Sequence, residues 1–168
     1  KYAGDSLKKI EYDTKMHFLD FLVDGTLYLG DYKKGLLKLR NNKPVLVKGG
    51  SFYKEKDIFS VLPFKKDKLF ITVSGEGVYV YNKNTGESNS IETLGKHFDE
   101  LNNYLKNVRV YNGTLLSTGD FAFGTLDDGL VIADGETGKI KYHYTDKNGL
   151  LDLTILGVFE SESNNLWL

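Results

Sequence analysis

A short apolar segment recurs four times along the chain at nearly constant spacing. The four copies occupy residues 27–30, 69–72, 121–124 and 166–168. Their first residues are 42 (27 to 69), 52 (69 to 121) and 45 (121 to 166) positions apart. In the first three copies a glycine stands five residues after the segment ends and starts a second apolar run; these are Gly35, Gly77 and Gly129. Periods of about 40–50 residues are typical of repeat proteins whose units stack on one another.

The residues of each repeat favour strands. Val, Ile, Leu, Tyr, Phe and Thr dominate the apolar runs, and Gly, Asn, Asp and Lys separate them. Asp24 and Gly25 suit a tight hairpin between two runs because both tolerate positive φ. Each repeat therefore reads as three strands followed by a weaker fourth, such as residues 45–47 or 140–144. Four-stranded units of this length predict the blades of a β-propeller.

The second strand of each repeat is apolar at every position instead of alternating with polar residues. A strand that is buried on both faces needs no alternation, and a propeller blade lies between two neighbouring blades. An ordinary sandwich with hydrophobic strands is the alternative. In a propeller we expect alternate residues to face opposite neighbours: Leu27 and Leu29 opposite Tyr28, Leu69 and Ile71 opposite Phe70, and Leu166 and Leu168 opposite Trp167.

The repeats divide the chain into units of roughly 16–57, 58–109 and 110–154, with a further blade starting at 155–168. The longest spacing leaves an excess in residues 91–106, where Leu94, Phe98, Leu101 and Leu105 follow the stripe of an amphipathic helix. We expect a short helix near residues 93–105 that covers apolar surface at the rim between two blades. The predicted fold is all-β: a fragment of a single propeller domain with about three to four four-stranded blades.

Composition narrows the classes of function. The 22 basic and 23 acidic residues give a net charge of -1, which argues against nucleic acid and anionic membranes as partners. No apolar run reaches the roughly 18–20 residues that span a bilayer. The absence of cysteine excludes disulfides, thiolate metal sites and a cysteine nucleophile.

The two ends of the sequence lead us to expect an internal piece of a longer protein. The chain opens at Lys1 and closes on Leu168 within an apolar strand. The expected partners are then the remaining blades and the adjoining domains of the parent chain, with self-association into a homodimer as a further expectation.

The repeats resemble a known sequence family. Asn148-Gly149-Leu150, followed by Ile155, Val158 and the closing Asn165-Leu166-Trp167-Leu168, resembles the two-component regulator propeller repeat. Gly124-Thr125 and Gly129-Leu130 match the other half of the pattern. The first unit matches with Tyr28 where the family prefers Trp, and the second departs further because Thr72 replaces a glycine.

This resemblance implies the periplasmic sensor region of a Bacteroidetes-type hybrid two-component histidine kinase. Such regions form seven-bladed propellers in inner-membrane proteins, and many members of the family sense oligosaccharides. Kinase activity would reside in other domains of the parent protein. The expected function is therefore a ligand-sensing propeller that signals to a histidine kinase.

Residues typical of catalysis are not grouped in the sequence. The histidines His17, His97 and His143 lie in different units without ligand spacing, and no phosphate-binding or nucleophile motif is present. We expect no catalytic activity, cofactor or metal site in this segment. Two alternatives to a sensor stay open: a non-catalytic protein-interaction scaffold and, ranked lower, a propeller carbohydrate-active enzyme.

Candidate ligand-binding residues lie on loops that share one end of the predicted propeller. The turn between the second and third strands and the connection to the next blade emerge at the same end, and loops on a rigid scaffold often carry function. Aromatic rings suit the apolar face of a sugar, whereas the charges leave open whether the glycan is neutral or anionic. The candidates are Tyr32, Lys34, Tyr53, Lys54, Glu76, Asp127 and Asp128.

Overall fold

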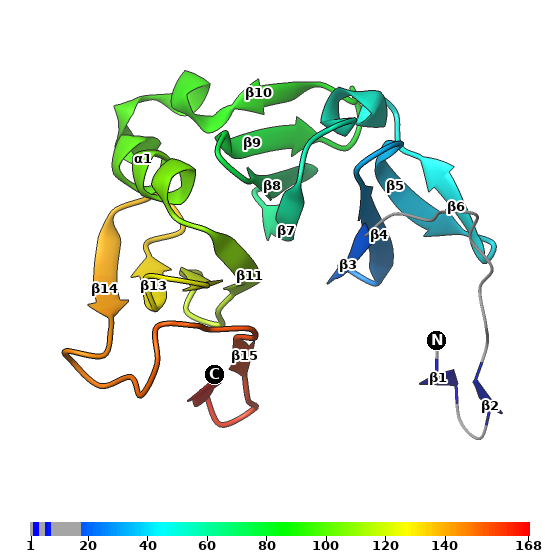
Figure 1. Cartoon of the computed structure of the whole chain (residues 1–168). Helices are drawn as coiled ribbons and strands as arrows, with labels where there is room; N and C mark the ends of the chain where they lie inside the picture. The colour runs from blue at the N-terminus through cyan, green and yellow to red at the C-terminus, as the bar shows by residue number, and fades with distance from the viewer. Residues whose placement is uncertain (1, 4–5, 8–17) are drawn as a thin grey trace.

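The computed structural model describes residues 2–3, 6–7 and 18–168. Three four-stranded antiparallel sheets, blades 1 to 3, follow one another along an arc (Figure 1). Blade 1 contains β3 (Phe18–Val23), β4 (Thr26–Asp31), β5 (Gly35–Arg40) and β6 (Lys43–Leu46). Blade 2 contains β7 (Ile58–Phe64), β8 (Lys68–Val73), β9 (Gly77–Asn82) and β10 (Ser88–Ser90). Blade 3 contains β11 (Val110–Leu115), β12 (Phe121–Thr125), β13 (Leu130–Ala133) and β14 (Ile140–Tyr144).

Two short hairpins and four helical segments complete the described elements. The hairpins are β1 (Tyr2–Ala3) with β2 (Ser6–Leu7) and β15 (Phe159–Glu160) with β16 (Leu166–Trp167). The helical segments are the 3-10 turns η1 (Gly50–Tyr53), η2 (Ile91–Leu94) and η3 (Lys96–Phe98), and the helix α1 (Asp99–Asn107). Among the described residues no helix has the length and apolar character to cross a bilayer.

Each blade is a meander in which spatial order equals chain order. The first strands β3, β7 and β11 lie toward the centre of the arc and the fourth strands lie at its rim (Figure 1). β7 contacts both β3 and β11. This radial arrangement confirms the all-β propeller fragment that the repeat predicts.

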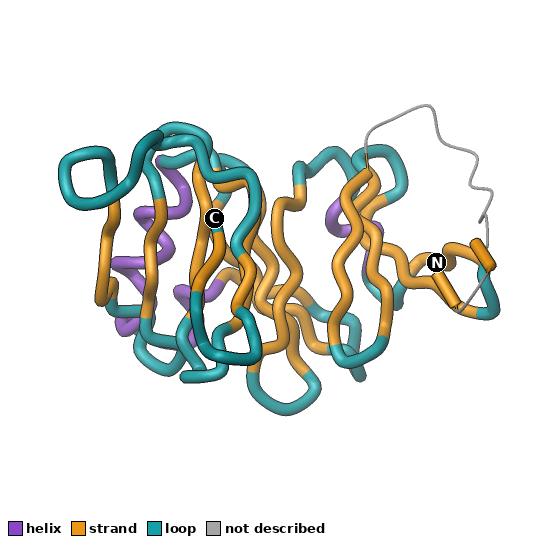
Figure 2. Tube along the Cα trace, turned by 90° about the horizontal axis from the view of Figure 1, so that it is seen from below, coloured by secondary structure: helices purple, strands orange, loops and turns teal. Residues whose placement is uncertain are grey.

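Loops collect at two ends of the strands (Figure 2). The connecting end carries the turns between the second and third strands together with the connections from blade to blade. The hairpin end carries the other two turns of every blade. All predicted ligand-binding residues belong to the connecting end.

The second strands are buried on both faces, as their apolar sequence predicts. The Phe70 ring of β8 lies 4.5 Å from the Phe121 ring and 5.9 Å from the Phe123 ring of blade 3, measured between centroids. Leu69 and Ile71 point the other way and share a buried cluster with blade 1. The blade 1 members of that cluster are Val23, Tyr28 and Leu36.

The last repeat does not share this two-sided burial. Leu166 is half-buried against blade 3, whereas Trp167 keeps 65% of its surface exposed and Leu168 keeps 54%. Among the described strands, β16 pairs only with β15. The expected opposition of Leu166 and Leu168 to Trp167 needs a neighbouring blade on each face and stays a prediction.

The predicted helix exists but begins later, at Asp99 instead of near residue 93. Gly95 has a φ of 110°, which separates the 3-10 turns η2 and η3 and prevents one continuous helix. Phe98, Leu101 and Leu105 share a buried cluster with β9, so the stripe covers apolar surface as expected. Leu94, by contrast, is exposed.

The glycine that opens the third strand of blade 2 is required by its surroundings. Gly77 has a φ of 87°, and a Cβ added there would overlap with the side-chain oxygen of Asn102. That oxygen accepts a hydrogen bond of 2.8 Å from the Val78 N–H, which ties the buried Asn102 of α1 to β9. Any larger residue at position 77 would therefore disturb the contact between helix and sheet.

We predict that Gly77→Ala destabilises the protein more than Gly75→Ala. Gly75 has a φ of 68° and open space around its Cβ position, so alanine there adds only left-handed backbone strain of about 1–2 kcal/mol. Gly77→Ala adds the collision with Asn102 to the same strain. Urea denaturation followed by circular dichroism measures the two midpoints, and equal midpoints would contradict the steric argument.

Candidate functional site

Two equivalent register shifts bring aromatic side chains to the connecting end. The pairing of β7 with β8 shifts between Ile58 and Ser60, and the pairing of β11 with β12 shifts between Val110 and Asn112. The residue left out of register is Phe59 in one strand and Tyr111 in the other. Such bulges re-aim a side chain, and both of these residues line one cavity.

This cavity, the axial pocket, has a volume of about 220 Å³. It lies where the inner strands of the three blades meet the connecting end. Tyr32 and Tyr111 are both partly exposed there, which leaves ring surface available to a ligand. The full lining consists of Leu19, Gly30, Tyr32, Lys56, Asp57, Ile58, Phe59 and Tyr111.

The ammonium of Lys56, at the wall of this pocket, is held by blade 2. Its Nζ donates to both carboxylate oxygens of Glu76, at 2.7 and 2.5 Å. The Tyr79 hydroxyl donates to the same carboxylate at 2.7 Å. The Lys56 Nζ also lies 5.4 Å from the centroid of the Phe52 ring and 5.7 Å from that of Tyr79. We call Lys56, Glu76, Tyr79 and Phe52 the Lys56 cluster.

The Lys56 cluster shifts the titration of two of its members. Partial burial favours the neutral form of Glu76, but the hydrogen bonds from Lys56 and Tyr79 outweigh it and hold the pKa of Glu76 below its usual value. Burial and the adjacent Glu76 carboxylate raise the pKa of Tyr79 to about 12. At neutral pH Glu76 is therefore ionised, and its carboxylate forms an ion pair with the Lys56 ammonium.

Asp127 and Asp128, predicted as ligand-binding residues, bind other parts of the chain. The Asp127 carboxylate accepts a hydrogen bond of 2.9 Å from the Arg109 Nε. The Asp128 carboxylate accepts one of 2.8 Å from the Tyr104 hydroxyl, and His143 Nε2 lies 3.3 Å from the same oxygen. Burial and the Asp128 carboxylate raise the pKa of Tyr104. These contacts fasten α1 and β14 to the turn after β12.

An equivalent ion pair therefore occurs in blades 2 and 3. In each, an acidic residue in the turn after the second strand pairs with a basic residue just before the first strand: Glu76 with Lys56 in blade 2, and Asp127 with Arg109 in blade 3. Backbone hydrogen bonds repeat it, from Ser74 N to Asp57 O and from Leu126 N to Arg109 O, both 2.9 Å long. These ion pairs and hydrogen bonds hold the turn after the second strand against the segment that precedes the first strand.

The other predicted residues fall in different environments. Tyr53 is completely buried beneath Phe52 and Tyr79, so the expectation that it presents a ring at the surface is wrong. The 3-10 turn η1 folds its side chain inward, and burial raises its pKa. Lys34 and Lys54 are exposed and do not line the axial pocket. Of the predicted residues, only Tyr32 lines it, while Glu76 holds its lysine.

Neither histidine of the described residues lines the axial pocket. His97 and His143 are exposed in separate elements, and His17 lies outside the described residues. Within the described ranges no three His, Cys, Asp or Glu side chains are grouped as a metal site requires.

Sequence reasoning missed Phe59 and Tyr111, although a signal for them exists. They are 52 residues apart (59 to 111), which is also the spacing of the second strands of the same two repeats (69 to 121). An aromatic residue thus occupies the same repeat position twice. The bulge that directs it into a pocket is set by strand pairing and is not visible in the sequence.

Comparison with solved structures identifies proteins of the same fold. The chain aligns with the extracellular domain of BT4673 from B. thetaiotaomicron in two crystal structures, with TM-scores of 0.55 and 0.54 at 15% and 13% identity. These alignments cover 90% and 91% of this chain and, in each case, 22% of the crystallised extracellular domain. BT4673 is described as a one-component system in the first structure and as a hybrid two-component system in the second.

A second protein of B. thetaiotaomicron gives a similar alignment. The extracellular domain of BT3049, described as a hybrid two-component system, matches with a TM-score of 0.51 at 19% identity, over 86% of this chain and 17% of that one. The chain thus spans about a fifth of the structures that it matches. No protein-family model and no curated protein matches the sequence. These alignments show that the chain shares the fold of these extracellular domains, which agrees with the fold expected from the repeat resemblance.

We predict that Lys56→Met raises the pKa of Glu76. In the wild type that pKa lies below its ordinary value of 4.5, so the ion pair contributes stability above about pH 4.5 and loses it as the pH falls through the lowered value. Burial raises the pKa of Glu76, and Lys56 lowers it. Removing the Lys56 ammonium therefore leaves the effect of burial without this opposing contribution. Titration of the Glu76 carboxyl carbon by NMR measures the change, with Lys54→Met as the control on the same connection. An unaltered pKa in Lys56→Met would contradict this assignment.

Proposed function

We propose that this chain forms part of the ligand-sensing propeller of an extracellular or periplasmic two-component sensor, and that its axial pocket recognises an oligosaccharide. The fold shared with extracellular domains of such systems supports the sensor role. The observation that carries the ligand assignment is the pair of bulges that direct Phe59 and Tyr111 into a pocket with Tyr32. Aromatic rings stack on the apolar face of a sugar, while neighbouring polar groups bind its hydroxyls.

The charges around the pocket favour a neutral sugar over an acidic one. Glu76 already binds the Lys56 ammonium, so that cation would have to leave its partner to neutralise a ligand carboxylate. Asp57, which also lines the pocket, adds a negative charge. A volume of about 220 Å³ suits one sugar ring, so the rest of an oligosaccharide would extend into solvent.

Signalling to a histidine kinase is the second half of the proposal. Through Glu76 the pocket wall is joined to the turn that precedes Gly77, and Val78 is hydrogen-bonded to α1 through Asn102. A ligand that moves Lys56 would therefore alter the contact between blade 2 and α1. The kinase itself would belong to other domains of the parent protein.

We predict that Tyr111→Ala and Tyr32→Ala each weaken binding of a neutral oligosaccharide about fivefold to tenfold. The loss of one aromatic stacking contact, on the order of 1 kcal/mol, sets this size. Tyr142→Ala is the matched control, because Tyr142 is an exposed tyrosine on the rim strand β14, remote from the pocket. Isothermal titration calorimetry of the full chain against neutral and uronic-acid-containing oligosaccharides measures the affinities.

Three outcomes of this titration would contradict the proposal. Absence of binding across the panel would remove the oligosaccharide assignment and favour the scaffold alternative. An equal loss in Tyr142→Ala would place the ligand elsewhere. Tighter binding of the acidic sugars would overturn the preference for a neutral ligand.

A further inference from the structure

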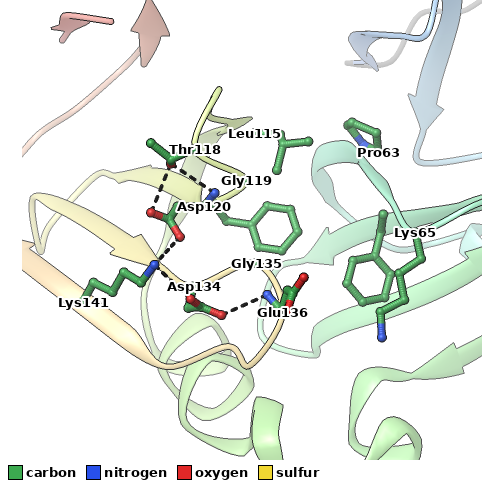
Figure 3. Close-up of a pocket in the computed structure, with 12 residues that line it drawn as sticks. Pro63, Lys65, Leu115, Thr118, Gly119, Asp120, Asp134, Gly135, Glu136 and Lys141 are labelled. Carbon is green, nitrogen blue, oxygen red and sulfur yellow. Dashed lines mark hydrogen bonds and ion pairs between the residues drawn. The ribbon is translucent and has the colours of Figure 1, made fainter.

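A larger cavity lies at the opposite, hairpin end of the sheets, between blades 2 and 3. Its volume is about 690 Å³, within the range of small-molecule sites. It shares no lining residue with the axial pocket. Two turns of blade 3, residues 118–121 and 134–136, form one wall, and residues 63–65 of blade 2 form the other (Figure 3). We call it the hairpin-end cavity.

An ammonium held between two carboxylates lines one side of this cavity. Lys141 Nζ lies 2.6 Å from Asp120 Oδ1 and 2.9 Å from Asp134 Oδ2 (Figure 3). The hydrogen bond from Lys141 and those from residues 136 and 137 lower the pKa of Asp134, and the two carboxylates raise the pKa of Lys141. Asp134 is therefore ionised and Lys141 protonated at neutral pH.

The chain itself fixes the position of both carboxylates. Thr118 Oγ1 donates to Asp120 Oδ2 at 3.1 Å. The N–H groups of Glu136 and Thr137 donate to Asp134 Oδ1 at 3.0 and 2.8 Å. Neither carboxylate needs to move to bind a ligand, and preorganised groups lose little freedom on binding.

The two turns that carry Asp120 and Asp134 are tightly packed against each other. A Cβ added to Gly135 would overlap with the carbonyl oxygen of Gly119, so the two turns touch through their backbones. Apolar side chains of both blades complete the lining: Pro63 and the buried Phe64 from blade 2, and Leu115 and the buried Phe121 from blade 3. The rings of Phe64 and Phe121 lie 6.2 Å apart. The cavity thus combines a polar face with an apolar one.

We propose that the hairpin-end cavity is a second binding site that takes a neutral, hydroxyl-rich ring such as a single sugar unit. Carboxylate, ammonium and carboxylate present acceptor, donor and acceptor in a row, which matches adjacent hydroxyl groups that each donate and accept. The three charges sum to -1, and Lys65 and Glu136 at the walls cancel each other, so an anionic ligand is disfavoured. This site does not depend on the proposed function of the axial pocket.

Amide chemical shifts of the ¹⁵N-labelled full chain test this site. Methyl β-D-glucoside is the neutral probe and D-glucuronate the anionic one. We expect the glucoside to shift the amides of Gly119, Gly135 and Glu136 saturably, with a dissociation constant on the order of millimolar for a ligand of this size. Glucuronate should bind at least tenfold more weakly.

Two variants locate the binding. Lys141→Met removes the donor and should weaken the response at least tenfold, whereas Lys139→Met, an exposed lysine that does not line the cavity, should leave it unchanged. Leu115→Trp fills the cavity without altering the charged array and should also abolish the response, which guards against misfolding of the lysine variant.

The proposal is overturned by any of three results. These are the absence of saturable shifts at the three amides, equal binding of glucuronate, or a response that survives both Lys141→Met and Leu115→Trp. Shifts confined to Tyr111 and Glu76 would place the sugar at the axial pocket alone. Because the two sites report through different amides, failure of one leaves the other separately tested.

Discussion

The Phe70 ring is completely buried between two blades, against Phe121 and Phe123 of the following sheet. Burial of such a ring contributes roughly 2–3 kcal/mol, and favourable ring geometry adds to it. Leu69 and Ile71, on the other face of the same strand, make the equivalent contact with the preceding blade. The second strands β8 and β12 thus each belong to two cores at once, so neighbouring blades stabilise one another as in other repeat proteins.

Strand pairing within each blade organises the connecting end. In blades 2 and 3 the turn after the second strand lies beside the segment that enters the same blade, and Lys56 meets Glu76 there as Arg109 meets Asp127. The first strands β7 and β11 depart from regular pairing only at positions 59 and 111. These register shifts direct aromatic rings toward the axis. The proposed ligand contacts therefore come from small local departures from the repeated blade structure.

The succession of four-stranded blades could be predicted from the sequence because apolar segments and glycines recur in register, and burial follows directly from such a pattern. Features that depend on contacts between residues distant in the sequence could not be predicted. Because of the backbone conformation of Gly95, the helix begins later in the sequence than predicted. The 3-10 turn after Gly49 buries Tyr53, although charged residues follow Tyr53 in the sequence. The sequence indicates the charge of Glu76 but not the lysine that binds it. Tyr32 was predicted at the connecting end, whereas Tyr111 depends on a bulge that only strand pairing defines.

Native-state hydrogen exchange in a Phe70→Leu variant tests most directly whether the blades share their cores. The substitution keeps an apolar side chain in β8 but removes the ring that contacts blade 3. The shared core predicts faster exchange of the amides of β8 and also of β12, two elements that have no hydrogen bond to each other. Loss of protection in β8 with unchanged protection in β12 would contradict the account, because it would mean that each blade is stable without its neighbour.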